Sequence, residues 1–253
     1  MAFLELHYRS DALKMEVSVN VILPDCAMAG DGATYKTLYL LHGLTNDYTC
    51  WMRRSSIERY AADYQLAVVM PSVGRSWYTD TPDGAKYLTF VGEELPRVCR
   101  SYFRGMTDAP EDNLVIGHSM GGYGAMKVAL TYPRKFGYVG ALSGAFDISR
   151  FGIFGSIAEC RRLFGNDLVA TEDLRGSKHD VFRLMKNRKK EGMIMPKLYL
   201  WCGESDALLP MSRSFHTLLD ELSVEHLYEE SAGDHEWGDW DLHIQSALKY
   251  LLQ

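Results

Sequence analysis

Cysteine is scarce in this sequence, and its pattern argues against the roles in which cysteine holds small proteins together. The five cysteines are odd in number, lie scattered between Cys26 and Cys202, and include no C-x-x-C pair. Disulfide frameworks and zinc sites need paired or regularly spaced cysteines, so neither is expected. We interpret the cysteines as reduced thiols that pack as small apolar side chains.

Long apolar segments are also missing. The first residues have neither the basic start nor the continuous apolar core of a signal peptide, and no later run is long and apolar enough to span a bilayer. These two absences predict a cytoplasmic protein that has no membrane partner.

Basic residues do not outnumber acidic ones, which argues against a nucleic-acid partner. The chain has 27 Lys and Arg against 33 Asp and Glu, a formal net charge of −6, so it has no general attraction for polyanions. The basic run at residues 186–191 contains no aromatic side chain to stack on bases, and we interpret it as the solvated end of a helix. A small neutral or cationic substrate is easier to accommodate.

The strand and helix signals that are present predict an α/β fold in which helices flank a mostly parallel sheet. The 253 residues suffice for one large domain, residues 1–253. Alternating apolar residues over 2–23 predict an antiparallel hairpin at the sheet edge, with a turn near Ser10. A loop is expected from Asp25 to Tyr35.

The remaining strands and helices are predicted from apolar runs and from helical spacing. Strands are expected at residues 37–41, 66–70, 113–116, 138–143, 198–202 and 226–228. Helices are expected at residues 51–64, 88–103, 122–132, 211–222 and from the last loop to Leu252. Pro96 implies a kink or a late start in the second of these helices.

Residues 117–121, Gly-His-Ser-Met-Gly, fit the pattern G-x-S-x-G between a predicted strand and a predicted helix. This context places Ser119 on a sharp turn, where Gly117 and Gly121 remove side chains that would clash as the backbone doubles back. The following helix aims unpaired N–H groups and the positive end of its dipole at charge that forms beside Ser119. We therefore predict that Ser119 is a nucleophile. A glycine-rich turn that merely contains serine is the alternative, and the flanking elements argue against it.

The loop after the strand at residues 37–41 supplies the second part of the predicted site. In hydrolases with this kind of turn, one oxyanion donor is the N–H of the residue after the nucleophile, and the other comes from the loop after the third strand. Met120 and Leu44 occupy these places. Gly43 lets the backbone approach the substrate, and His42 is expected to brace the loop. An ordinary strand-ending turn is the alternative.

The last third of the chain supplies the acid and the base. Asp206 follows the strand at residues 198–202 and is the favoured acceptor for the Nδ1–H of a histidine, with Glu204 as its rival. His235, in a polar loop before the last helix, is the candidate base. The order Ser119, Asp206, His235 is that of the α/β-hydrolase fold.

Two segments are candidates for substrate contact. Residues 146–195 interrupt the strand–helix repeat, and an insertion of this length must pack against another part of the molecule. We expect a helical cap above Ser119, with Phe154 and Phe164 among its apolar residues. Trp77 and Tyr78 follow the strand at residues 66–70, at the sheet edge where α/β folds bind ligands. They are therefore candidate substrate-binding residues, although an aromatic pair that covers a hairpin is the alternative.

Four segments together resemble one known group of enzymes. They are residues 41–45 (Leu-His-Gly-Leu-Thr), 117–125 (Gly-His-Ser-Met-Gly-Gly-Tyr-Gly-Ala), 203–206 (Gly-Glu-Ser-Asp) and 233–237 (Gly-Asp-His-Glu-Trp). They are similar to the tributyrin esterase (EstA-like) group of the esterase D and carbohydrate esterase family 1 superfamily, and the resemblance covers nearly the whole chain. It implies a cytoplasmic carboxylesterase for short-chain acyl esters, with acetylated sugars or aryl esters as further substrates.

S-formylglutathione hydrolases are close relatives that share two stretches of these segments, His-Gly-Leu-Thr at residues 42–45 and Gly-His-Ser-Met-Gly-Gly at residues 117–122. Around the base, however, the chain has Asp-His-Glu-Trp-Gly-Asp-Trp in place of their Asp-His-Ser-Tyr-Tyr pattern. This departure favours an oxygen ester over formylglutathione.

The predicted chemistry runs in two halves. His235 takes the proton as Ser119 attacks the ester carbonyl, the amides of Leu44 and Met120 hold the oxyanion, and water then hydrolyses the acyl-enzyme. No cofactor or metal is needed, and the expected partner is a small-molecule ester. An acyltransferase and a non-catalytic protein that binds acylated ligands are the rivals. The lack of a secretion signal argues against the acyltransferase. The complete set of four catalytic elements argues against the non-catalytic protein. Whether the chain forms a homo-oligomer is left open.

Overall fold

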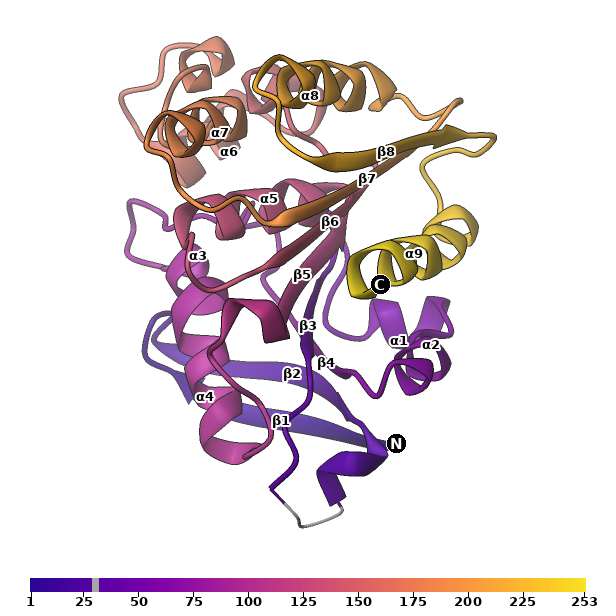
Figure 1. Ribbon diagram of the computed structural model, residues 1–253. Coiled ribbons are helices and arrows are strands. Elements are labelled where there is room, and N and C mark those ends of the chain that lie inside the picture. The colour runs from indigo at the N-terminus through magenta and orange to yellow at the C-terminus, as the bar shows by residue number, and fades with distance from the viewer. Residues whose placement is uncertain (29–31) are drawn as a thin grey trace.

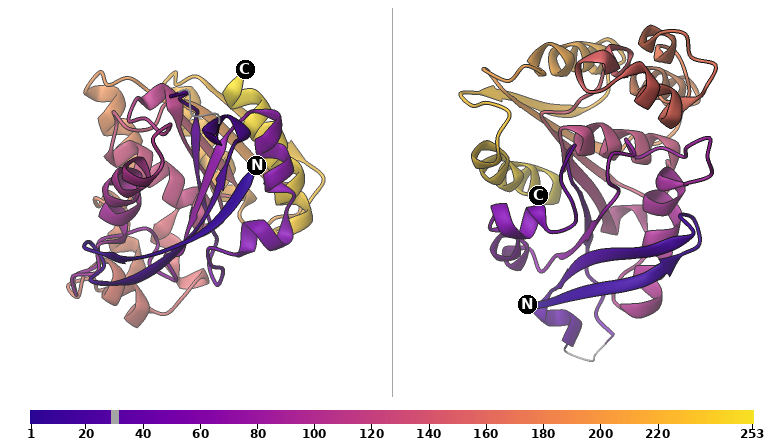
Figure 2. Two further views of the ribbon diagram at one scale, coloured as in Figure 1. Left: turned by 90° about the horizontal axis from the view of Figure 1, so that it is seen from below. Right: turned by 180° about the vertical axis from the view of Figure 1, so that it is seen from behind.

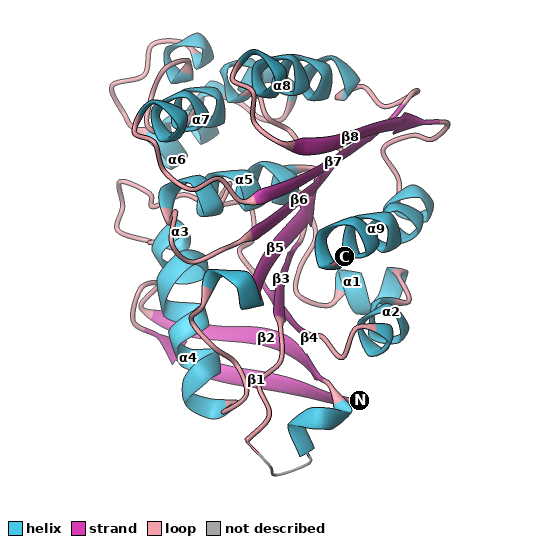
Figure 3. Cartoon of the chain, viewed as in Figure 1, coloured by secondary structure: helices cyan, strands magenta, loops and turns pink. Residues whose placement is uncertain are grey.

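The computed structural model describes residues 1–28 and 32–253, and its centre is one sheet of eight strands with helices on both faces (Figures 1 and 3). The strand order is β1-β2-β4-β3-β5-β6-β7-β8. The strands are β1 (Ala2–Ser10), β2 (Met15–Leu23), β3 (Thr37–Leu41), β4 (Ala67–Pro71), β5 (Asn113–His118), β6 (Tyr138–Leu142), β7 (Lys197–Gly203) and β8 (His226–Ser231). The predicted α/β-hydrolase fold is confirmed.

The N-terminal hairpin forms the antiparallel edge of this sheet. β1 pairs with β2 from Ala2 opposite Leu23 to Ser10 opposite Met15, and β2 pairs antiparallel with β4. The other neighbouring strands are parallel. The hairpin prediction is confirmed. Of the predicted loop from Asp25 to Tyr35, residues 29–31 lie outside the described residues.

The helices form a layer on each face of the sheet (Figure 2). One layer holds α1 (Cys50–Arg54), α2 (Ile57–Asp63) and α9 (Trp237–Leu252). The other holds α3 (Tyr87–Thr89), α4 (Leu95–Tyr102), α5 (Met120–Thr131), α6 (Ile157–Phe164), α7 (Val181–Lys190) and α8 (Leu209–Glu221). Because β3 to β7 are covered on both sides, their residues are almost all buried, which explains the continuous apolar runs. No described helix is long and apolar enough to cross a membrane.

The helix predicted over residues 51–64 is broken into α1 and α2. Ser55 has an extended backbone, with φ −139° and ψ 171°. The N–H of Ser56 donates to the Asp241 carboxylate at 2.9 Å, and the Tyr60 hydroxyl donates to its other oxygen at 3.1 Å. A carboxylate from α9 therefore caps the start of α2, and this partner lies far away in the sequence.

The effect of Pro96 is a widened turn. Proline lacks the N–H that would bind the carbonyl four residues earlier, which here is that of Gly92. A π-helical turn, Phe90–Glu94, precedes α4, and the N–H of Leu95 binds the carbonyl of Phe90. Lys135 Nζ donates to the free Gly92 carbonyl at 3.2 Å. The α-helix thus starts late, as one of the two predicted alternatives stated.

The insertion of residues 146–195 is helical and packs on the outer side of α5. It contains the short 3-10 segments Ile148–Ile153 and Thr171–Leu174, together with α6 and α7. The basic end of α7 is only partly solvated, because Arg188 is buried and donates to the carbonyls of Ala129, Pro133 and Ile194. The prediction of a fully solvated basic run was wrong at Arg188. The guanidinium replaces backbone partners that this loop region lacks.

Candidate active site

Ser119 lies on a strained turn between β5 and α5. Its backbone has φ 55° and ψ −121°, a conformation that non-glycine residues adopt only where the surroundings impose it. A Cβ added at Gly117 would lie 2.4 Å from the Gly121 carbonyl oxygen, and one at Gly121 would lie 2.5 Å from the Leu41 carbonyl oxygen. Glycine is therefore required at both positions, as the motif predicted.

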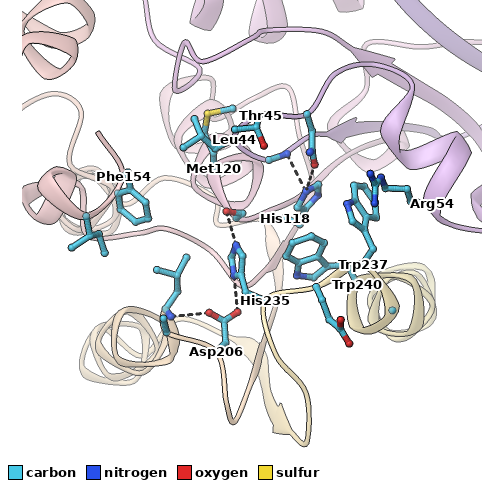
Figure 4. A pocket seen from close by; sticks show the side chains of 18 of the residues that line it. Leu44, Thr45, Arg54, His118, Met120, Phe154, Asp206, His235, Trp237 and Trp240 are labelled. Carbon is cyan, nitrogen blue, oxygen red and sulfur yellow. Dashed lines mark hydrogen bonds and ion pairs between the residues drawn. The ribbon is translucent and has the colours of Figure 1, made fainter. Parts of the chain in front are cut away.

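Three residues from distant parts of the chain are joined by hydrogen bonds at the carboxyl ends of the strands (Figure 4). His235 Nε2 lies 3.0 Å from Ser119 Oγ, and His235 Nδ1 lies 2.8 Å from Asp206 Oδ2. The structure thus brings together the three residues predicted as nucleophile, base and acid. Glu204, the rival acid, is exposed, and its described hydrogen bond is that of its backbone N–H to Ser231.

The environment of Asp206 keeps its carboxyl ionised. Burial raises its pKa, but hydrogen bonds from His235, Ser143 and the Leu208 N–H outweigh burial and hold the pKa below its usual value. The side chain is fully buried, while that of His235 is 34% exposed. A fixed anion behind a partly exposed imidazole orients the ring and would stabilise its protonated form.

Two further histidines near Ser119 have structural partners. His42 Nδ1 donates to the Gly43 carbonyl at 2.8 Å, and its Nε2 accepts from the Val73 N–H at 3.0 Å. His118 Nε2 accepts from the Gly43 N–H at 3.1 Å. Burial lowers the pKa of both rings, that of His118 strongly, so both are neutral. His42 therefore braces the loop, as expected.

Leu44 and Met120 line the pocket together with Ser119, and Figure 4 shows both residues across His235 from Asp206. Met120 is the first residue of α5, where no preceding helical turn supplies an acceptor. Neither N–H donates a hydrogen bond among the described residues. Gly43 brings this loop close, since an added Cβ there would lie 3.3 Å from the Ser119 Cβ and 2.6 Å from His118 Nε2. Two free N–H groups beside a serine can hold a developing oxyanion.

The serine lines a pocket of about 800 Å³, within the usual size range for small-molecule sites. Figure 4 shows Phe154 on one side of His235, and Trp237 with Arg54 on the other. The Phe154 side is apolar and includes Trp77, whose ring is in contact with that of Phe154. The pocket thus has one end suited to an acyl chain and one end that is aromatic and charged.

Trp77 and Tyr78 have different positions. Trp77 lines the pocket, and its ring lies 5.0 Å from that of Phe154. Tyr78 is fully buried outside the lining, and its hydroxyl donates to the His42 carbonyl at 2.8 Å. Its ring presses on α5 at Gly124, where an added Cβ would lie 2.3 Å away. The expectation that Tyr78 lines the substrate site is therefore corrected, because its ring is used in packing.

The expected cap reaches the pocket only at one corner. Ile153 and Phe154 are the insertion residues that line it. Phe164, the other candidate wall residue, packs its ring 5.6 Å from Phe151 and 5.0 Å from His179. Most of the apolar residues of the insertion cover α5 and its neighbours, because that helix face would otherwise be exposed.

Sequence reasoning missed the aromatic wall on the far side of the pocket. The ring of His118 lies 4.7 Å from that of Trp237 and 4.2 Å from that of Trp240, and Arg54 lies 5.9 Å above the Trp237 ring. The sequence did contain a signal for this wall. Two tryptophans lie three residues apart shortly after His235, and residues at this spacing share a helix face. Arg54 carried no comparable signal.

Comparisons with known proteins agree with this geometry. The model of the family Esterase, described as putative esterase, matches residues 10–251. An acetyl esterase of Caldicellulosiruptor saccharolyticus is 32% identical to this chain over an alignment of 266 positions, which covers 99% of this chain and 98% of that protein.

Two solved structures from Staphylococcus aureus are similar over their whole length. The substrate-bound fluorophosphonate-binding serine hydrolase FphF has a TM-score of 0.92 at 33% identity, with 100% of this chain and 98% of that chain covered. The S-formylglutathione hydrolase FrmB has a TM-score of 0.89 at 32% identity, with 100% and 99% covered.

Proposed function

This chain belongs to the esterase family, and from that premise we propose that it is a serine carboxylesterase that hydrolyses short-chain acyl esters through an acyl-enzyme on Ser119. The observation that carries the proposal is the hydrogen-bonded chain from Ser119 through His235 to Asp206. A cytoplasmic enzyme of the tributyrin esterase group is the finer assignment that we propose.

The proposed mechanism follows from the positions of these groups. His235 Nε2 takes the proton of the Ser119 hydroxyl as Oγ attacks the ester carbonyl, and Asp206 stabilises the imidazolium. The N–H groups of Leu44 and Met120 bind the oxyanion. His235 returns the proton to the departing alcohol. Water then attacks the acyl-enzyme by the same route, which releases the acid and the free serine.

We propose that the acyl chain lies toward Phe154 and the alcohol toward Trp237. The apolar lining at Phe154, Ile153 and Trp77 supports this orientation. Each methylene buried there should gain up to ~0.8 kcal/mol while room remains. Beyond the wall, displaced side chains cost roughly 1–3 kcal/mol, more than one or two methylenes return. Acetyl to butyryl esters are therefore the proposed substrates.

The test is a series of p-nitrophenyl esters with acyl chains of two to twelve carbons. We expect kcat/KM to rise toward propionyl or butyryl and to fall steeply by octanoyl. A value that still climbs at twelve carbons would contradict a closed acyl pocket and indicate an open groove. Acetylated sugars, measured in parallel, test which alcohol groups the Trp237 end of the pocket accepts.

A thioesterase of the S-formylglutathione hydrolase type is the second candidate, because FrmB is similar over the whole chain. The tryptophan wall after His235 supports an oxygen ester instead, since it departs from the pattern of those hydrolases. Matched oxygen and thioesters of one acyl group distinguish the two, with S-formylglutathione included. Addition of a competing alcohol reveals any acyl transfer that accompanies hydrolysis.

A further inference from the structure

Two histidines and an aspartate gather at the end of β8 that is remote from Ser119. His216 and Asp220 are one turn apart on α8, and His226 is the first residue of β8. Their candidate ligand atoms all lie within 4.8 Å of one another. His235, in contrast, follows the other end of β8, and the strand itself is roughly 17 Å long at ~3.3 Å per residue. The cluster is therefore separate from the hydrolytic site.

The hydrogen bonds of His226 leave one ring nitrogen available to a ligand. Its Nδ1 lies 2.8 Å from the Val224 carbonyl, an acceptor only, so Nδ1 carries the proton and Nε2 carries a lone pair. That lone pair points at His216 Nδ1, which is 2.7 Å away. A histidine whose second nitrogen is held by a carbonyl has the tautomer and orientation typical of metal ligands.

The other two residues complete a set of three ligands. Asp220 Oδ1 lies 3.8 Å from His226 Nε2, and Asp220 Oδ2 lies 3.4 Å from His216 Nε2. The His216 ring is stacked on Tyr228, with ring centroids 4.3 Å apart. The His226 side chain is 6% exposed and the Asp220 side chain 62%, so the cluster has a rigid inner ligand and an entry path from solvent.

We propose that His216, Asp220 and His226 bind a zinc ion, with water in the fourth position. Zinc bonds to histidine nitrogen at about 2.0–2.1 Å, so two nitrogens on a tetrahedral ion lie roughly 3.3 Å apart. The two imidazoles would have to separate by only about 0.6 Å from their present contact. The proton that they share would leave for the outer nitrogen of His216 or for solvent. The mixed imidazole and carboxylate set suits zinc better than calcium or magnesium, which prefer oxygen ligands.

The ion would hold the edge strand β8 to α8. The two elements are joined by a short turn, and among the strands that the structure describes β8 has one neighbour, β7. A ligand that binds only the folded chain raises its stability in proportion to the logarithm of ligand concentration. At a hundred times its Kd, zinc should raise the Tm by roughly 5 °C or more.

The experiment uses the full chain, treated with EDTA and dialysed. Isothermal titration with zinc chloride should give one ion per chain, and cobalt should give the strong visible absorption of a four-coordinate site. On α8, His216 is half-buried and Asp220 is exposed, so H216Q and D220N should fold normally and lose at least about tenfold in zinc affinity. H226Q tests the inner ligand. H7Q is the matched control, because exposed His7 has a carboxylate, Glu5, at 3.9 Å but belongs to no three-ligand cluster among the described residues.

Ester hydrolysis is the second readout. H216Q and D220N should hydrolyse p-nitrophenyl acetate like the parent, so a failure of the zinc site and a failure of the proposed esterase are distinguishable. No zinc binding by the parent, or binding that H216Q and D220N leave unchanged, would overturn the proposal. Binding that is lost in H235Q instead would do the same, because it would assign the ion to the hydrolytic pocket.

Discussion

The Ser119 turn (residues 113–131) and the insertion (residues 146–195) pack against each other but are held by different kinds of interaction. The turn is held by backbone geometry. Ser119 N–H donates to the Leu142 carbonyl at 2.9 Å, and its own carbonyl accepts from Gly122 and Tyr123. The glycines are required because the backbone segments approach so closely. Little of this depends on long side chains.

Two buried basic side chains contact the insertion or belong to it: Arg188 fastens it, whereas Lys127 reaches it at the cost of burying an amine. Arg188 reaches from α7 to carbonyls at the end of α5 and beyond it, and burial lowers its pKa to about 10. Lys127 reaches the opposite way, from α5 to His179, with Nζ 3.3 Å from His179 Nδ1 and a contact to Thr79 Oγ1. Burial and the charge of Lys127 lower the pKa of His179 to about 3.

In this protein, backbone geometry determines the chemistry and side-chain packing determines the selectivity. The turn positions the reacting groups and tolerates little change. The insertion reaches one corner of the pocket through Ile153 and Phe154 and leaves several apolar residues in solvent, among them Ile153 itself at 57% and Ile194 at 88% exposure. Changes in the turn should therefore abolish activity, and changes in the insertion should alter stability or substrate range.

The largest effect is expected for Ser119→Ala. Loss of the nucleophile should reduce kcat/KM by about 10⁶ while the Tm stays almost the same, because the hydroxyl contributes little to packing. Hydrolysis of p-nitrophenyl acetate and thermal denaturation measure the two quantities. Ser205→Ala, an exposed serine beside Asp206, is the control and should be as active as the parent. Fluorophosphonate should label the parent at Ser119 only, and appreciable turnover by the alanine variant would discard the assignment.

The second effect is expected for Asp206→Asn. The fold should remain, but kcat should fall by about 10⁴, as happens in serine proteases when the orienting carboxylate is removed. Glu204→Gln is the matched control on the same loop and should cost less than about threefold, because surface changes away from the site have small effects. If the two losses were reversed, Glu204 would be the acid.

The third prediction concerns the fastening of the insertion. Arg188→Ala should lower the free energy of unfolding by about 3 kcal/mol, because it leaves several carbonyls without their donor. Lys189→Ala, the exposed neighbour, should change stability by less than about 0.5 kcal/mol. Urea denaturation of both variants measures the difference. Equal losses would mean that the buried guanidinium does not hold the insertion.

The fourth prediction concerns Lys127 and pH. Burial lowers its pKa well below the usual value, so the folded chain binds fewer protons here than the unfolded chain. Stability should therefore rise as the pH rises toward about 10.4, the pKa of an unperturbed lysine. Lys127→Met should add roughly 2 kcal/mol at pH 7 and less at pH 9.5.

Lys186→Met is the control, because Lys186 is exposed and is not among the charges that shift the pKa of Lys127. Its variant should keep the pH dependence of the parent. Urea denaturation at both pH values decides the matter, and a slope with pH that survives in Lys127→Met would contradict the assignment.

The smallest effect is a shift in acyl preference. Phe154→Ala should move the fall in kcat/KM to longer acyl chains and improve the octanoyl ester several-fold, since each methylene gains up to ~0.8 kcal/mol once room exists. Phe164→Ala removes the same side chain outside the pocket lining and should leave the order of preference unchanged. The octanoyl-to-butyryl ratio of kcat/KM is the measurement, because it does not depend on how much enzyme is folded. Equal ratios in the two variants would mean that Phe154 does not close the acyl end of the pocket.

Much of the fold and of the serine turn could be predicted because local chemistry dictates them. Continuous apolar runs indicate strands covered on both faces, and the glycines of G-x-S-x-G indicate a turn too close for side chains. Ser119, Asp206 and His235 were found because each follows a predicted strand at the same edge of the sheet. Their catalytic roles stay predictions until the variants are measured.

Features that depend on distant partners could not be predicted. The helix break at Ser55 needs Asp241, and the burial of Arg188 needs carbonyls of another element. Trp77 and Tyr78 are neighbours in the sequence, but the Tyr78 ring packs on α5, whereas Trp77 lines the pocket.

The sequence by itself therefore determined which apolar runs form buried strands, where the strained serine turn lies and which groups are candidates to react, since these features depend on neighbours along the chain. Only the tertiary structure decided which side chains form the pocket walls, which cations are buried, and that His216, Asp220 and His226 meet. The physical reason is that periodicity and backbone sterics act over a few residues. Side-chain burial is shared among elements whose relative positions no local pattern records.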